Sequence, residues 1–255
     1  PNGIRGIHRQ VRSGVTHCAL VVNAGSRDER RGEFGIAHLT EHALFKGTER
    51  RRAYQVNCRL ENLGGELNAY TTKEDTTLHA TVLRRDFARA AELIADVMFR
   101  STFPERELKK EREVIADEIN TYKDSPSERI YDDFEDMIFR GSELGHNILG
   151  SKRTIARLST EDIERFVART YTTDQMVFSS IGNFSVATAR NVAERYLGAV
   201  TPTTRHFERH TPGVYEPFDT RLARHTHQAH GIIGTRGYGI TCDKRLPLAL
   251  LVNIL

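Results

Sequence analysis

The sequence predicts an α+β fold in which an antiparallel-rich mixed sheet has helices packed on one face. Segments typical of strands and of helices follow one another mostly without the strand–helix–strand alternation that builds a parallel sheet. Short turns separate successive strand segments, as in antiparallel sheets. The chain has 255 residues, of which 38% are hydrophobic and 28% charged, and this composition describes a globular protein with one large domain or two small ones.

Five strands are expected within residues 1–200. Each coincides with a short run rich in β-branched and other apolar residues, and turn-forming residues bound these runs. Ser13-Gly14 supplies the turn after the first strand, and Lys73-Glu74-Asp75 joins the third strand to the fourth. The expected strands are residues 4–11, 16–23, 66–72, 76–83 and 175–181.

Helices are expected where apolar residues recur with helical spacing behind a capping residue. Asp86 suits the N-cap of one of them, and Ser159 with Asp162 resembles a capping box at the start of another. The expected helices are residues 53–63, 86–100, 104–122, 125–139, 159–170 and 186–197, together with the segment between Gly35 and Gly47.

Residues 38–42 have the sequence H-x-x-E-H within the first expected helix. Four residues of α-helix advance about 6 Å and turn about 400°, so His38 and His42 lie one above the other and can bind one metal ion. Glu41 lies on the same side, where a carboxylate can take a proton from a metal-bound water. The pattern reverses the H-E-x-x-H signature of metalloproteases.

The alternative interpretation of this helix is an amphipathic surface helix with two exposed histidines and a solvated glutamate. The local sequence disfavours it, because apolar residues leave little of the helix free to face water. Polar groups on such a helix are costly unless something pairs with them, and a metal ion would satisfy both imidazoles. The apolar neighbours are Ile36, Ala37, Leu39, Ala43, Leu44 and Phe45.

A third metal ligand is expected on the charged helix at residues 104–122, since catalytic zinc sites usually combine three protein ligands with an open fourth position. Apolar residues recur every seven positions along one stripe of this helix, from Leu108 to Tyr122. Glu111 and Glu118 lie between them, where a core-facing helix normally carries leucine. Glu118 is the expected ligand, with Glu111 near it. For Glu111 alone, a charged surface helix with an interrupted stripe is an equally good interpretation.

Together these residues resemble the pitrilysin-like zinc peptidases, the family that includes the mitochondrial processing peptidase β subunit. Residues 35–48 resemble the family's metal-binding helix and the turn after it. Glu118 stands 76 positions after His42, which is the family's usual spacing to its third ligand. Glu111 occupies the position of a second acidic residue near the metal, and residues 145–150 resemble the loop after the third-ligand helix.

The resemblance implies two similar halves in the complete protein. Residues 1–200 are the expected N-terminal zinc-binding peptidase half, and residues 201–217, which contain three prolines, are the expected linker. Residues 218–255 are the expected start of a truncated second homologous half. A faint echo of the first half supports this division, with a strand at residues 227–234 and a helix at residues 245–255 that lacks the histidines. The chain stops within an apolar run, so we expect a fragment.

The resemblance further implies a zinc-dependent endopeptidase that hydrolyses peptide bonds in peptides or unfolded segments by metal-activated water. One zinc ion is expected on His38, His42 and Glu118. Catalytic roles are assigned to Glu41 and Glu111. Zinc lowers the pKa of a bound water to about 7, which makes the nucleophile available at neutral pH.

Substrate binding is assigned, on the same resemblance, to an edge strand. Residues 64–71 resemble the family's Gly-Gly and Asn-Ala-x-Thr strand, so the peptide is expected to add as a strand beside Asn68, Ala69 and Tyr70. The residues alone favour an ordinary strand of the sheet. A second homologous half or subunit is expected to close the chamber, with a homodimer as one form of that partner. In the family the second half supplies an Arg/Tyr pair, so the isolated fragment is expected to lack activity.

Composition argues against several other classes of protein. No apolar run approaches the roughly 18 to 20 residues of a membrane span. The net charge is +3, and without interleaved aromatic and basic residues no nucleic-acid partner is expected. The three scattered cysteines suit a reducing compartment. We therefore expect a cytoplasmic protein, or a periplasmic one if a leader was removed.

Two other interpretations of function stay open. One is a non-catalytic structural or partner subunit of the same fold, and a weaker one is a metal-binding module without hydrolytic activity. Non-catalytic relatives typically lose one or more motif residues, whereas this chain keeps all four, which favours the enzyme. His146 follows a glycine and is expected to hydrogen-bond within its loop rather than to bind metal.

Overall fold

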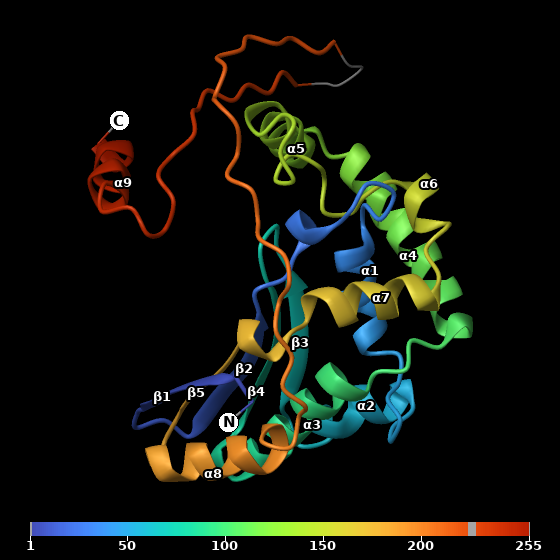
Figure 1. Cartoon of the computed structure of the whole chain (residues 1–255), viewed down its shortest axis with the longest axis vertical. Helices are drawn as coiled ribbons and strands as arrows, with labels where there is room; N and C mark the ends of the chain where they lie inside the picture. The colour runs from blue at the N-terminus through green and yellow to red at the C-terminus, as the bar shows by residue number, and fades with distance from the viewer. Residues whose placement is uncertain (1, 224–227, 255) are drawn as a thin grey trace.

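A computed structural model describes residues 2–223 and 228–254 of the chain. Within these residues, five strands form one mixed sheet against which helices pack, which confirms the predicted α+β class (Figure 1). The strands are β1 (Arg5–Gln10), β2 (Val15–Val22), β3 (Glu66–Thr71), β4 (Thr76–Leu83) and β5 (Met176–Gly182). The helices are α1 (Ile36–Leu44), α2 (Ala53–Glu61), α3 (Phe87–Arg100), α4 (Glu105–Lys123), α5 (Pro126–Ile138), α6 (Lys152–Ile155), α7 (Thr160–Thr170), α8 (Val186–Leu197) and α9 (Arg245–Ile254).

The strand order is β1-β5-β2-β4-β3, with β1 parallel to β5 and the other pairings antiparallel. The turn at Ser13-Gly14 therefore does not form a hairpin, because β5 lies between the two strands that it connects. Burial explains the insertion. In β1 no side chain is fully buried, whereas β5 buries Met176 and Phe178 and so takes an inner position. The predicted pairing of β3 with β4 through residues 73–75 is confirmed.

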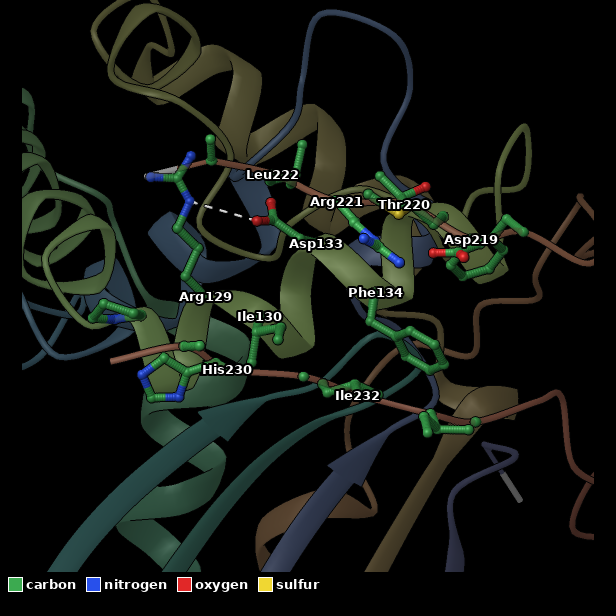
Figure 2. A pocket seen from close by; sticks show the side chains of 18 of the residues that line it. Arg129, Ile130, Asp133, Phe134, Asp219, Thr220, Arg221, Leu222, His230 and Ile232 are labelled. Atoms are coloured by element: carbon green, nitrogen blue, oxygen red, sulfur yellow. Dashed lines mark ion pairs between the residues drawn. The ribbon is translucent and has the colours of Figure 1, made fainter. Parts of the chain in front are cut away.

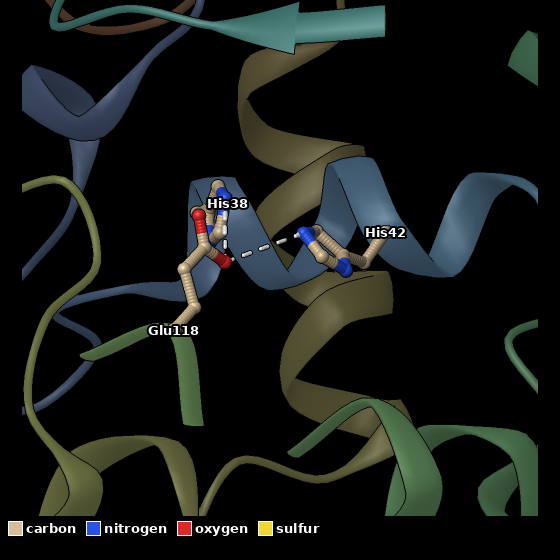
Figure 3. A group of neighbouring side chains, drawn as sticks. All are labelled: His38, His42 and Glu118. Carbon is tan, nitrogen blue, oxygen red and sulfur yellow. Dashed lines mark ion pairs between the residues drawn. The ribbon is translucent and has the colours of Figure 1, made fainter. Parts of the chain in front are cut away.

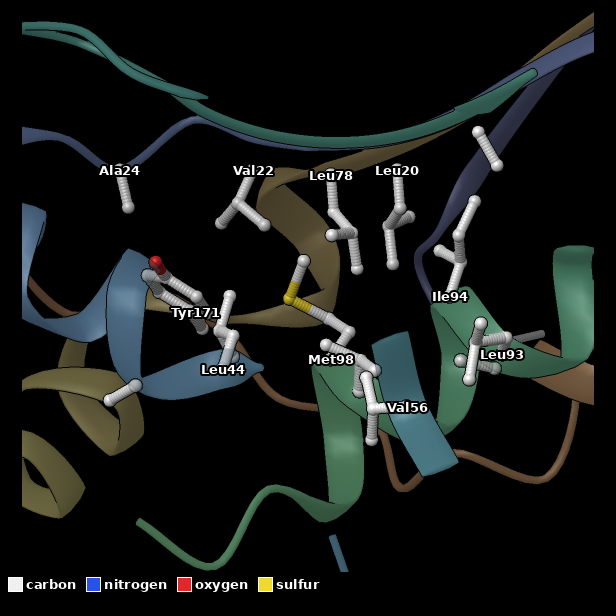
Figure 4. Close-up of a cluster of buried hydrophobic side chains, with 14 of the residues drawn as sticks. Leu20, Val22, Ala24, Leu44, Val56, Leu78, Leu93, Ile94, Met98 and Tyr171 are labelled. Carbon is white, nitrogen blue, oxygen red and sulfur yellow. The ribbon is translucent and has the colours of Figure 1, made fainter. Parts of the chain in front are cut away.

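The core lies between one face of the sheet and the helices (Figure 4). Leu20 and Val22 of β2 and Leu78 of β4 point from the sheet toward the helices, and α3 contributes Leu93 and Ile94 to the same cluster. All five are fully buried, and each such side chain contributes about 1.5 to 3 kcal/mol to folding. Burial alternates along β2, as expected for a strand with one face on the core.

Two glycines, Gly35 and Gly150, allow the start of α1 to pack closely against the loop before α6. Gly35, the N-cap of α1, has φ 97°, and a Cβ atom there would lie 2.5 Å from Ile155 Cδ1 and 2.7 Å from the Leu149 carbonyl oxygen. The residue opposite, Gly150, has φ 66° and leaves no room for a Cβ beside Phe34. The helix then packs between α4 and α7, which places its H-x-x-E-H segment against the charged helix.

The other predicted helices are confirmed within a few residues of their expected ends. Ser159 caps α7 as expected, since its hydroxyl accepts from the Asp162 amide and the Asp162 side chain accepts from the Ser159 amide. The short helix α6 was not predicted. It has four residues and is held by its own capping pair, Ser151 with Thr154, rather than by apolar periodicity.

The C-terminal part leaves the compact first half. Residues 201–217 contain no helix or strand. Within this segment the Arg209 guanidinium contacts residues before position 200, because it donates to the two Asp28 carboxylate oxygens at 2.9 and 2.8 Å. The predicted strand at residues 227–234 is wrong over its described part, because residues 228–234 have no neighbouring strand to pair with; His227 lies outside the described residues. Helix α9 forms as expected, with its large apolar side chains exposed. The division into halves stays a prediction.

Cys18 should be the slowest of the three thiols to react. Its side chain is buried in the core, and burial raises the pKa of its thiol to about 12, whereas Cys58 and Cys242 are partly exposed. Since the thiolate is the reactive form, a native-state thiol assay at pH 8 should modify Cys18 about a thousandfold more slowly than an ordinary thiol. Peptide mapping of the labelled protein would identify the sites, and equal labelling of all three would contradict the burial.

Candidate metal centre

Helix α1 presents both histidines of the motif on one face. The ring centroids of His38 and His42 are 4.6 Å apart, and their side chains are 11% and 23% exposed. Apolar residues surround them as the sequence predicted, since seven of the nine residues of α1 are buried. The surface-helix alternative is therefore wrong.

Helix α4 brings Glu118 to the two imidazoles (Figure 3). Glu118 Oε2 lies 3.7 Å from His38 Nε2 and 3.9 Å from His42 Nε2, and one ligand atom from each residue lies within 4.8 Å of the others. Ligand atoms bound to zinc at 2.0–2.2 Å in a tetrahedron are about 3.3 to 3.6 Å apart. Small side-chain rotations would bring this set to that separation, so the residues fit a zinc ion.

The environment of His38 favours its neutral form. Burial, with a smaller contribution from His42, lowers the pKa of the His38 imidazole to about 4. Its lone pair is therefore available to a cation at neutral pH without competition from protons. The buried Nδ1 of His38 has no hydrogen-bond partner among the described residues. Two imidazoles and one carboxylate are a donor set that catalytic zinc sites use.

Glu111 lies behind His42 and resolves the alternative that the sequence left open. Its Oε2 accepts from His42 Nδ1 at 3.0 Å, and its Oε1 lies 2.8 Å from Lys46 Nζ. Burial alone would raise the pKa of Glu111, but the hydrogen bonds from His42 and Lys46 outweigh it and hold the pKa below its ordinary value. Glu111 is a buried, paired carboxylate rather than part of an interrupted surface stripe. A carboxylate on one ring nitrogen orients a histidine so that the other nitrogen faces the metal.

Glu41 sits beside the cluster in a partly buried position. Burial raises the pKa of its carboxyl, while hydrogen bonding to Thr71 and the nearby His42 act in the opposite direction. Thr71 is the last residue of β3, so the Glu41 carboxylate and the edge strand meet at this point. Burial raises the pKa of the Tyr171 hydroxyl, Thr76 acts in the opposite direction, and Glu41 is close enough to raise this pKa further.

The predicted substrate-binding residues lie on the edge strand of the sheet. Only β4 pairs with β3 among the described strands, which leaves the other edge of β3 open. Asn68 and Tyr70 are exposed, whereas Ala69 turns toward the core. The Asn68 side-chain oxygen accepts from the Ala69 amide at 2.9 Å. The topology is that of a strand able to accept another, and its use by a substrate stays a prediction.

Three of the residues around the cluster escaped the sequence prediction. Lys46 follows the end of α1, Thr71 comes from β3, and Tyr171 comes from the end of α7. Their contacts depend on how these elements pack, which no local pattern encodes. His146 does form a hydrogen bond, but its partner is not in its own loop: His146 Nε2 bonds Glu29 Oε2 at 2.8 Å, from a segment 117 positions away.

Residues 9–152 match the family described as Insulinase (Peptidase family M16). The chain belongs to peptidase family M16. Residues 157–255 match the part of that family described as the Peptidase M16 inactive domain. The resemblance to pitrilysin-like zinc peptidases is thereby confirmed.

Relatives of this M16 chain include proteins named as zinc proteases. The chain is 32% identical over 234 residues to the zinc protease YmxG of Bacillus subtilis, described as uncharacterized, a match that covers 92% of this chain and 57% of that protein. It is 32% identical over 188 residues to the human mitochondrial-processing peptidase subunit beta, covering 73% of this chain and 38% of that subunit. The chain thus spans 57% of the Bacillus protein and 38% of the human subunit.

Solved structures with the same fold include a protease from Helicobacter pylori, with a TM-score of 0.77, 23% identity, and coverage of 85% of this chain and 52% of that chain. The first half of the periplasmic protease PqqL from Escherichia coli has a TM-score of 0.76 and 21% identity, over 82% of this chain and 46% of that one. At these identities the likeness concerns the fold alone. In the M16 chain, no helix of the described residues has the length and apolar character needed to cross a membrane.

A cavity of about 900 Å³ lies elsewhere, between α5 and the C-terminal segment (Figure 2). Phe134 and Ile130 of α5 face Ile232 across it, and Arg129 lies 3.8 Å from Asp133 on its rim. Its lining includes none of the residues of the metal cluster. We assign this cavity no function.

Proposed function

We propose that this chain is the metal-binding half of a zinc-dependent endopeptidase that hydrolyses peptide bonds in peptides or unfolded segments. The convergence of His38, His42 and Glu118 from two helices carries the proposal. Three protein ligands with an open fourth position are typical of catalytic zinc. Glu41 stands next to this position on the same helix, and the chain's relatives include named zinc proteases.

Each residue of the cluster then has a role. Zinc, when bound, supplies a Lewis acid that lowers the pKa of water to about 7 and polarises the scissile carbonyl. Glu41 accepts a proton from the attacking water and returns it to the leaving amine. The raised pKa of its carboxyl brings it nearer to the neutral range in which a general base works best. Glu111 keeps His42 Nδ1 engaged, so that Nε2 remains directed at the ligand position.

The substrate would bind as an added strand at the open edge of β3. Backbone groups of Asn68, Ala69 and Tyr70 would set its register, and alternate side chains would enter pockets on either side. Thr71, the last residue of β3, lies close enough to Glu41 to lower the pKa of its carboxyl, and this supports the placement, because a peptide lying along β3 would reach the general base at the end of the strand. The Asn68 side chain would give up its bond to the Ala69 amide when the peptide pairs there.

A second homologous half, a separate subunit or a second copy of the chain would close the chamber. The chain spans 57% of the Bacillus relative, and another relative is named as a subunit of a processing peptidase, which supports a partner. All three cysteines are unpaired, and we propose the cytoplasm as the compartment. The alternative function is a non-catalytic partner subunit of the same fold.

Zinc analysis with a cleavage screen tests the function. The purified full-length protein should contain about one zinc per chain and cleave members of a mixed-peptide library. A chelator should abolish cleavage, and added zinc should restore it. Zinc without cleavage would favour the non-catalytic subunit or the metal-binding module. A protein that retains no zinc would overturn the proposal.

A further inference from the structure

Glu29 is a buried carboxylate that touches the start of the metal-binding helix without belonging to it. Its side chain is 0% exposed. Glu29 Oε2 accepts from the Gly35 amide at 3.0 Å, and Oε1 accepts from the Ala37 amide at 2.9 Å. A carboxylate is expensive to bury unless hydrogen bonds satisfy it, and here both oxygens are committed to the first turn of α1.

Helix α1 cannot supply this cap from its own residues. Its N-cap is Gly35, which has no side chain, and its first turn contains no acidic residue. The first amides of a helix have no partner within the helix, and a negative charge there is favourable because it meets the positive end of the helix dipole. Glu29, six residues before the N-cap Gly35, accepts from these amides and places a negative charge at the positive end of the helix. His38 follows Ala37 directly, so the turn that Glu29 holds is the turn that carries the first candidate ligand.

A second segment fixes Glu29 in place. His146, from the loop after α5, donates from Nε2 to Glu29 Oε2 at 2.8 Å, and its ring stacks on Phe34 with centroids 4.2 Å apart. The Lys73 ammonium donates to the backbone carbonyl of His146, which ties this loop to the turn between β3 and β4. The carboxylate is therefore held from a direction independent of α1.

We propose that Glu29 is a positioning residue of the metal centre, whose carboxylate caps α1 from outside the helix and sets the height and rotation of the turn that carries His38. His146 holds that carboxylate in place. The inference rests on the proposed function, because it concerns how the same metal centre is oriented. Nothing in the helix's own sequence replaces the cap if Glu29 is lost.

The test is Glu29→Gln in the full-length protein. Glutamine replaces one of the two carboxylate oxygens with an NH2 group, which donates and so cannot accept from the amide that this oxygen served. In the metal-free protein, hydrogen exchange of the Gly35 and Ala37 amides should accelerate at least tenfold. Zinc affinity, measured by chelator competition, should fall about tenfold, the lower end of the effect seen when a residue supporting a metal ligand is changed. The visible absorption bands of the cobalt-substituted protein should also shift, because they report ligand geometry.

Glu33→Gln is the matched control. Glu33 lies in the same loop, but its carboxylate pairs with Arg169 at 2.8 Å and with the Arg30 amide, not with α1. This variant should keep wild-type zinc affinity and cobalt spectrum. If Glu29→Gln lowers thermal stability but matches Glu33→Gln in both metal readouts, Glu29 is only structural and the proposal is overturned.

Changes at His146 keep the test informative if Glu29→Gln does not fold. His146→Leu leaves the carboxylate but removes its outer partner, and should reproduce part of the loss of zinc affinity. His146→Gln retains a donor and should restore near wild-type values. Equal affinities in the two variants would overturn the role of His146. If the wild type itself binds no zinc, the proposed function fails. Separately, if hydrogen exchange of the Gly35 and Ala37 amides is unchanged in Glu29→Gln, the proposal that Glu29 caps α1 is overturned.

Discussion

Replacing Glu41 by glutamine should leave zinc bound and reduce the kcat of peptide cleavage by about 10²- to 10⁴-fold, the usual contribution of a general base. Glutamine keeps the size of the side chain and can still hydrogen-bond Thr71, but it cannot accept the proton of the attacking water. His38, His42 and Glu118 are unchanged, so the metal ligands remain. The loss should therefore appear in kcat rather than in zinc content.

Steady-state kinetics on a cleaved library peptide, together with zinc quantification on the same preparation, measure this effect. Glu49→Gln is a suitable control, since Glu49 is an exposed glutamate shortly after α1 and its loss should change neither quantity. Normal cleavage by Glu41→Gln would show that another group removes the proton. A loss of zinc in the same variant would instead indicate that Glu41 supports the metal, and the division of roles along the motif would have to change.

Local sequence predicted the two helices of the metal centre because each carries its own signal. The H-x-x-E-H spacing places both imidazoles on one face whatever surrounds the helix. The position of Glu118 on an apolar stripe placed its carboxylate toward the neighbouring helix, and the structure brings it within 3.7 Å of His38 Nε2. These inferences need only helical periodicity. The predicted ligand roles await the metal measurements.

What the sequence could not predict depends on contacts between distant segments. The insertion of β5 between β1 and β2 joins residues more than 150 positions apart, and β1 gave no sign of it beyond its few apolar side chains. No local pattern pointed to Glu29, because it lies six residues before the N-cap of the helix that it caps and so does not match a capping box. Nothing in the sequence distinguishes Lys46 from other surface lysines, and its role is visible only from its ion pair with Glu111. A glycine at the N-cap with no acid in the first turn is the one clue that could have prompted a search for an external cap.

Replacing Glu118 by glutamine should weaken zinc binding by on the order of a hundredfold or more, since changing a residue that merely supports a ligand already costs about 10- to 100-fold. The two histidines come from a single helix, and Glu118 is the only member of the cluster that comes from α4. A neutral amide loses the charge attraction to the cation. The side chain is 35% exposed, so the metal-free variant should fold with nearly wild-type stability.

Chelator competition measures the zinc affinity, and thermal unfolding of the metal-free proteins measures stability. Glu113→Gln, an exposed position on the same helix, should retain wild-type affinity. Glu111→Gln should fall between the two, at about tenfold weaker binding, because it removes the partner of His42 Nδ1 without removing a ligand. If Glu118→Gln keeps its zinc while Glu111→Gln loses it, the third ligand is Glu111. In that case His42 would bind through Nδ1, the nitrogen that faces Glu111, rather than through Nε2.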